Sequence, residues 1–183
     1  MRKILISFAV VLIAVGATGA PATAASSPAL NRQVSGPFKG TSDFNGSADC
    51  SFVKQVYDAT YQPTDRRDDH DKKHPRSGFF HLTGCVEFTG GDFTYSGSFV
   101  LTTPNRAVLR GTVSGNVGNS SVPCPAGFFS ASLDLRLSVT SGTRGFRDAT
   151  GDIRLTGGWC STGFPGRPGP IGGYLTGGLT STL

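Results

Sequence analysis

The residues whose types could bind a metal are concentrated in the most polar stretch of the chain, residues 65–74. This stretch holds His70 and His74 among aspartates, arginines and lysines, and imidazole and carboxylate groups can coordinate a cation. However, charges of both signs are interspersed, the spacing is not that of an EF-hand, and no expected helix or strand holds the ligands. We interpret the stretch as a solvated loop and assign no metal and no cofactor to the chain.

Residues for acid–base or nucleophilic catalysis are equally sparse. His81 and Glu87 fall on one face of an expected strand, but about 20 Å separates them, too far for one to assist the other. Glu87 is the only glutamate, and we find no second carboxylate for a glycosidase pair. Ser114 stands one place late for a nucleophile elbow within Gly111–Gly115. The sequence therefore predicts no catalytic residue and favours a non-enzymatic protein.

The four cysteines, Cys50, Cys85, Cys124 and Cys160, contain no C-x-x-C pair, which argues against a zinc site. In an exported chain they indicate two disulfides, for which three connectivities exist. We favour Cys50–Cys85 and Cys124–Cys160, because each bridge joins neighbouring parts of the chain. A different pairing would weaken the strand order expected below.

The N-terminus has the pattern of an export signal. Arg2 and Lys3 precede an apolar run too short for a comfortable membrane span, and an A-x-A pattern follows at residues 22–24. We predict that residues 1–24 are a cleaved signal peptide and that the protein is secreted, without stable membrane insertion after cleavage. An uncleaved membrane anchor is the alternative.

The rest of the chain suits one domain. We expect residues 25–34 to form a flexible segment and residues 35–183 to form the folded domain. The 17 basic residues exceed the 12 acidic ones only mildly and are scattered, so no nucleic-acid partner is expected. The oligomeric state is left open.

Period-two alternation, broken by turn residues, predicts an all-β fold of about eight strands. The expected strands are residues 36–44, 50–58, 78–89, 92–102, 107–117, 132–140, 152–160 and 173–182.

Glycine recurs on the apolar face of these strands, flanked by large apolar residues two positions away. Leu82-Gly84-Val86 and Leu155-Gly157-Trp159 are two of five such motifs. Glycine marks bends where a sheet closes and leaves room for a bulky side chain from across the sheet. The pattern predicts a single antiparallel up-and-down barrel, with an open β-sandwich as the alternative.

Two hairpins can be given a register. Gly90-Gly91 is a two-residue turn signal, so Thr89 should pair with Asp92. The partners further along are Phe88 with Phe93, Val86 with Tyr95, Gly84 with Gly97, Leu82 with Phe99, and Phe80 with Leu101. For the later hairpin the expected partners are Leu135 with Ile153, Leu133 with Leu155, Asp134 with Arg154, and Arg136 with Asp152.

The barrel interior is the expected place for a ligand. An eight-stranded barrel is either filled by side chains or holds one small molecule, and the possible lumen-lining residues are Tyr95, Phe99, Trp159 and Phe88. For the second expected strand, residues 50–58, the sequence does not decide which side chains face inward. If a Cys50–Cys85 bridge lies outside, Val53 and Tyr57 face inward.

Residues 141–151, Ser-Gly-Thr-Arg-Gly-Phe-Arg-Asp-Ala-Thr-Gly, resemble a turn of the allene oxide cyclase and dirigent barrel superfamily. The hairpin between Gly91 and Gly115 is similar to that of secreted bacterial relatives, so the resemblance covers about residues 91–160. Arg144 departs from the pattern, which usually has glycine there. The resemblance implies a calycin-like barrel with an apolar lumen. The catalytic carboxylates and arginines of the plant members have no match here, and none is carried over.

The leading hypothesis is a secreted, disulfide-stabilised barrel that binds a small apolar ligand or a partner protein. One alternative is a cofactor-free cyclase or isomerase, which would need an ionisable residue inside the lumen. Another is a structural surface protein. An empty apolar pocket of about 300 Å³ or more in the lumen favours ligand binding, and a packed lumen favours the structural role.

Overall fold

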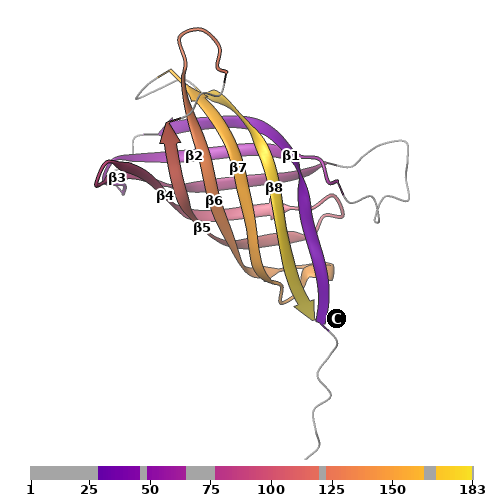
Figure 1. The fold of residues 1–183 in the computed structure, drawn as a ribbon. Helices are drawn as coiled ribbons and strands as arrows, with labels where there is room; N and C mark the ends of the chain where they lie inside the picture. Colours follow the sequence, from indigo (N-terminus) through magenta and orange to yellow (C-terminus); the bar gives the residue numbers. More distant parts are fainter. Residues whose placement is uncertain (1–28, 46–48, 65–76, 120–122, 163–167, 183) are drawn as a thin grey trace, which may run out of the picture.

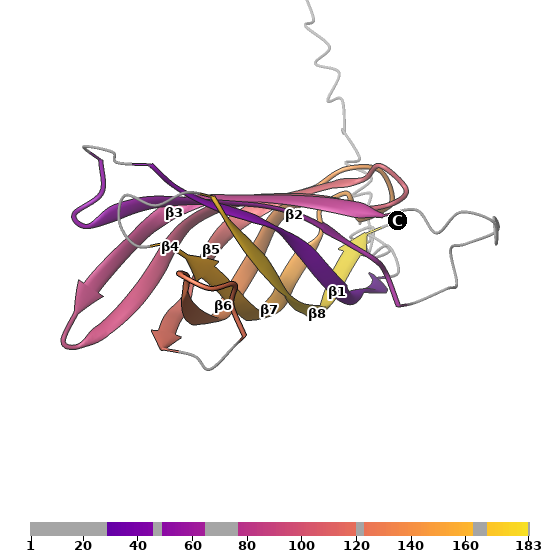
Figure 2. The ribbon, with the colours of Figure 1, turned by 90° about the horizontal axis from the view of Figure 1, so that it is seen from above.

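Eight antiparallel strands pair in sequence order and close into a barrel, as Figures 1 and 2 show for the computed structural model. The structure describes residues 29–45, 49–64, 77–119, 123–162 and 168–182. The predicted signal peptide and the polar stretch at residues 65–74 lie outside them. The strands are β1 (Ala29–Asn45), β2 (Val53–Tyr61), β3 (Gly78–Thr89), β4 (Asp92–Thr102), β5 (Val108–Asn119), β6 (Phe129–Gly142), β7 (Thr150–Ser161) and β8 (Gly169–Thr182).

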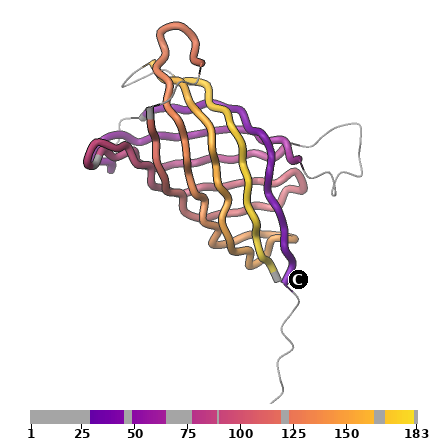
Figure 3. The backbone as a smooth tube through the Cα atoms, in the orientation of Figure 1, coloured from indigo at the N-terminus to yellow at the C-terminus, as the bar shows by residue number. Residues whose placement is uncertain are grey.

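Pairing of the first strand with the last closes the sheet. The β1–β8 ladder runs from Ala29 opposite Thr182 to Ser42 opposite Gly169, and Figure 3 shows the two strands side by side. The barrel prediction is confirmed, and the sandwich alternative is excluded. One boundary needs correction: residues 29–34, expected in a flexible segment, are strand because β8 supplies their backbone partners.

The predicted register of the β3–β4 hairpin is confirmed from Thr89 opposite Asp92 to Phe80 opposite Leu101. The turn residues Gly90 and Gly91 have φ values of 66° and 101°. Two successive positive φ angles suit a tight hairpin turn whose twist matches that of the strands. The short turn therefore fixes the register of the whole ladder.

The predicted register of the β6–β7 hairpin is wrong by two residues. Leu135 lies opposite Leu155, and Arg136 lies opposite Arg154. A shift of two leaves every side chain on its own face, so the apolar pattern is equally satisfied by both registers. The expected ion pairs still form, because each arginine reaches diagonally to an aspartate on the neighbouring strand.

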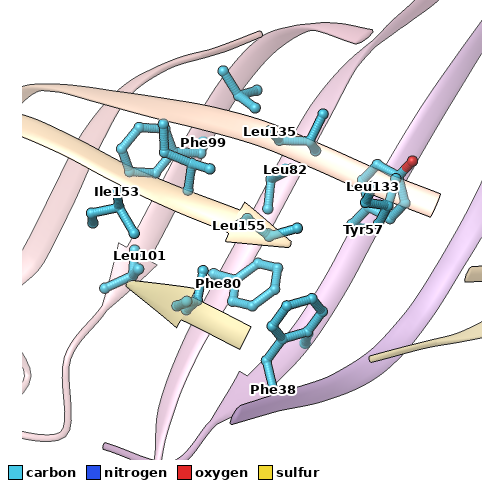
Figure 4. Packing of buried hydrophobic residues seen from close by; sticks show 14 of the residues in the cluster. Phe38, Tyr57, Phe80, Leu82, Phe99, Leu101, Leu133, Leu135, Ile153 and Leu155 are labelled. Atoms are coloured by element: carbon cyan, nitrogen blue, oxygen red, sulfur yellow. The ribbon is translucent and has the colours of Figure 1, made fainter. Parts of the chain in front are cut away.

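The inward side chains fill one continuous core. In β2 the inner face carries Val53 and Tyr57, which settles the choice that the sequence left open. Figure 4 shows side chains from opposite walls pointing toward one another. The rings of Phe38 and Phe80, on β1 and β3, are 5.2 Å apart in an edge-to-face arrangement.

Inward glycines make room for aromatic rings in this core. A Cβ atom added to Gly84 would lie 2.9 Å from the Tyr95 ring, and one added to Gly111 would lie 2.8 Å from the Phe99 ring. Both positions would also meet backbone atoms of the adjacent strand. The repeated glycines therefore allow a tightly coiled sheet and seat the large side chains inside it.

Candidate ligand-binding site

Two disulfides brace one end of the barrel, which we call the disulfide end. Cys50, in the β1–β2 connection, is bonded to Cys85 of β3, and Cys124, in the β5–β6 connection, is bonded to Cys160 of β7. Both predicted bridges are confirmed. Because the strands alternate in direction, the β1–β2, β3–β4, β5–β6 and β7–β8 connections all lie at this end.

Phenylalanines gather at the disulfide end, and we call them the aromatic rim: Phe52, Phe88 and Phe129, which are exposed, and Phe93, which is half-buried. The Phe93 ring lies 4.8 Å from that of Phe88 and 5.8 Å from that of Phe52. Phe129, at the start of β6, is 73% exposed. Several apolar rings grouped on one surface are typical of a contact site, so the rim is a candidate apolar contact surface.

The four predicted lumen-lining residues take different positions. Tyr95 and Phe99 are buried inside the barrel. Trp159 is half-buried and faces inward, with its ring 4.8 Å from that of Phe44. Phe88 is a correction: it continues the inward alternation of β3 but is 57% exposed, because it lies at the tip of the β3–β4 hairpin, beyond the enclosed lumen.

Below the rim, the lumen contains a layer of polar groups that the sequence analysis missed. The side chain of Gln55 is fully buried, and Tyr57 is 1% exposed. Among the described residues, no partner lies within hydrogen-bond distance of either Gln55 amide atom, the Tyr57 hydroxyl or the Trp159 indole nitrogen. Each buried unpaired group costs about 1–3 kcal/mol. The alternation of β2 could have revealed Gln55, had the inner face of that strand been known.

Other polar groups in the same layer are paired. The Tyr95 hydroxyl donates to the main-chain carbonyl of Gln55 at 3.2 Å, and the Ser42 hydroxyl donates to the carbonyl of Gly169 at 3.3 Å. The ring of Tyr57 meets that of Tyr95 edge-to-face, with 5.3 Å between centroids. The hydrogen bond to Gln55 and the contact with Tyr57 hold the ring of Tyr95 in place. The Gln55 amide and the Tyr57 hydroxyl remain without partners among the described residues.

Burial governs the protonation of the lumen tyrosines. It raises the pKa of Tyr57 well above its usual value, and the nearby Tyr95 adds to the effect. Burial also raises the pKa of Tyr61 and Tyr95. All three phenols therefore stay protonated at neutral pH and can donate or accept hydrogen bonds without bringing charge into the lumen.

His81 takes part in a network on the outer face, but not with Glu87. Its Nδ1 lies 2.7 Å from an Asp58 carboxylate oxygen, and its Nε2 lies 2.8 Å from the Thr83 hydroxyl. Asp58 stands directly opposite His81, a pairing that requires the β2–β3 register. Because β3 lies between β2 and β4, its N–H groups are used in two ladders, and the arrangement offers no oxyanion hole beside Thr83. We interpret it as a structural network.

A depression of about 460 Å³ lies on the outer face of β5 to β8, not in the lumen. Its walls include the ion pairs Arg136–Asp152 and Asp134–Arg154. The charges of each pair neutralise one another across the strands, so the depression does not favour a charged ligand of either sign.

Two absences hold for the described part of the chain. No group of three or more histidine, cysteine, aspartate or glutamate side chains is positioned there to hold a metal ion. Nor is any helix in it long and apolar enough to cross a membrane.

No family model, curated protein or solved structure matches this chain.

Proposed function

We propose that the protein is exported and binds a small, mainly apolar molecule at the disulfide end of its barrel, without transforming it. The observation that carries the proposal is the buried Gln55 amide, which has no partner among the described residues. An apolar side chain at this place would stabilise the empty barrel more. An amide is favoured when a ligand supplies the missing hydrogen bonds.

The position of Gln55 supports access from the disulfide end. Gln55 pairs with Phe44, one position inside the end of the β1–β2 ladder. The rings of Phe44 and Trp159 are both half-buried and lie against each other. A ligand entering here would pass beneath these two rings, which shift to admit it, and place its apolar part against the aromatic rim.

Export is supported by the cysteines. All four are paired in disulfides, and such bonds persist mainly in oxidising compartments outside the cytoplasm. Together with the signal-like N-terminus, this favours an extracellular site of action.

We also propose a distant relationship to the allene oxide cyclase and dirigent barrels. The closed eight-stranded barrel agrees with the fold that the resemblance implies. Arg144, which replaces the usual glycine of the turn, has a φ of 56°. That left-handed conformation is one that glycine adopts without strain, so the backbone of the turn is compatible with the family pattern even where the residue differs.

A structural role is the second candidate, favoured by the packing of the lumen. Phe80, Leu101, Leu109 and Ile153 are fully buried, and rings from different strands are in contact within the core. A barrel packed in this way can serve as a rigid surface protein without holding a ligand.

Native mass spectrometry tests the proposal on protein purified from the medium of the producing cells. We expect an additional small-molecule mass that is lost on denaturation. Binding is then measured with 1-octanol and n-octane as probes, using the fluorescence of Trp159, the only tryptophan in the chain. Phe88→Ser should weaken binding of both probes about three- to tenfold, since part of a phenyl contact is lost.

The matched control is Phe79→Ser. Phe79 is also exposed, at 44%, but it lies at the start of β3, at the opposite end of the barrel. The Phe79→Ser substitution should leave the affinities for 1-octanol and n-octane unchanged. The absence of any co-purifying mass, together with failure of both probes to bind, would overturn the proposed function and leave the structural role.

A further inference from the structure

The charged side chains that face the lumen limit the kind of ligand that the lumen can bind. Among the inward-facing positions of the described strands, Arg32 is the single charged residue. Arg32 lies far from Gln55, near the opposite end, with its guanidinium 5.3 Å from the Phe146 ring centre. No inward carboxylate or ammonium group of these strands stands near the polar layer.

The unpaired groups of the layer are a mixed set of donors and acceptors. The Gln55 amide can donate two hydrogen bonds and accept others, the Tyr57 hydroxyl can do both, and the Trp159 indole nitrogen can only donate. A ligand group that satisfies them must itself donate and accept. Because burying an uncompensated charge is far more costly than burying a neutral polar group, that group must be uncharged.

We propose that the polar layer of Gln55, Tyr57 and Trp159 receives a neutral hydrogen-bonding head group, such as an alcohol or an amide, of a ligand with an apolar tail. The inference rests on the proposed function and specifies its ligand. The head enters first, beneath the rings of Phe44 and Trp159. Gly84, which stands opposite Gln55, lies four positions before Phe88, about 13 Å along the strand. An extended octyl tail and the Phe88 side chain together cover this distance.

Three probes of equal chain length test the head group: 1-octanol, n-octane, and octanoate at about pH 8, where its carboxyl group is ionised. Trp159 fluorescence follows binding of each probe to the purified protein. We expect 1-octanol to bind and octanoate to bind at least tenfold more weakly. Gln55→Met, which keeps the length and removes the amide, should weaken 1-octanol about five- to tenfold and leave n-octane unchanged or tighter.

The matched control is Gln33→Met, the same substitution at an exposed position of β1. It should change none of the three affinities. A second variant, Tyr57→Phe, removes only the hydroxyl oxygen, so it keeps the test available if Gln55→Met folds poorly. It too should weaken 1-octanol selectively.

Two outcomes would overturn the head-group inference while leaving the proposed function intact. One is octanoate binding as tightly as 1-octanol. The other is an equal effect of Gln55→Met and Tyr57→Phe on 1-octanol and n-octane. Failure of all three probes to bind, together with the absence of any co-purifying mass, would instead remove the proposed function and this inference together.

Discussion

Asp152 shows how a single side chain on the outer face is held by its neighbours. Arg136 donates to one of its carboxylate oxygens at 2.5 Å, and the Ser138 hydroxyl donates to the other at 2.7 Å. The hydrogen bond from Arg136, followed by that from Ser138, lowers the pKa of Asp152 to about 2. The Asp152 side chain is 39% exposed and that of Arg136 is 68% exposed, so solvent screens the interaction and its contribution to stability is small.

At the residue scale, we predict that Asp152→Asn lowers the stability at neutral pH. An unfolded aspartate has a pKa near 3.9, above the folded value. The stabilisation is therefore complete above about pH 4 and disappears as the pH falls toward about 2. Urea denaturation of both proteins over this range should show their midpoints converging. Added salt should narrow the difference at neutral pH, and a gap that persists below pH 2 would contradict the assignment.

At the scale of the strands, glycine is required on the inner face of the sheet but not on the outer face. Gly177 and Gly178 are adjacent in β8. A Cβ atom added to Gly177 would lie 2.6 Å from the Ile153 Cα atom, whereas one added to Gly178 would meet nothing within 4 Å. The inward glycine is therefore required by close approach of β7, and the outward one is not.

This pair gives a prediction with its own control. Gly177→Ala should destabilise the protein by about 1–3 kcal/mol, because the added methyl group overpacks the β7–β8 contact. Gly178→Ala should be neutral or stabilise by about 0.5–1 kcal/mol, since alanine loses less conformational entropy on folding. Thermal or urea denaturation measures both. Equal effects of the two substitutions would show that the inward glycines do not shape the barrel.

At the scale of the whole molecule, the β1–β8 ladder closes the barrel and the two disulfides cross-link its disulfide end. They link residues 35 and 36 positions apart. In the chain-entropy description, loops of equal length restrict the unfolded chain equally. The two bridges should therefore contribute equally to stability, although one joins β3 and the other joins β7.

We predict that replacing either pair by serines lowers the free energy of unfolding by about 3–4 kcal/mol. The double substitutions Cys50→Ser with Cys85→Ser, and Cys124→Ser with Cys160→Ser, are compared by urea denaturation. The wild-type protein, unfolded and refolded in reductant, serves as the control and should lose more than either variant. A loss confined to one pair would indicate strain or unfolded-state structure at the other.

Some features of this protein were determined by the sequence alone. Alternation gave the eight strands, because the side-chain period of two is a local property. The Gly90-Gly91 turn determined the β3–β4 register, because a two-residue loop leaves no freedom to the strands that it joins. Both disulfides were predicted by pairing each cysteine with the next one along the chain.

Only the tertiary structure decided the rest, because it depends on contacts between distant residues. The predicted β6–β7 register was wrong, because seven residues, including a 3-10 turn at Arg144–Phe146, separate the strands. A shift of two residues also leaves every side chain on the same face of the sheet, so the apolar pattern does not exclude it. Which residues of β2 face inward depends on the neighbouring strands, so the burial of Gln55 could not be predicted either. Phe88 follows the inward alternation yet is exposed, because where a barrel opens is set by how far adjacent strands extend.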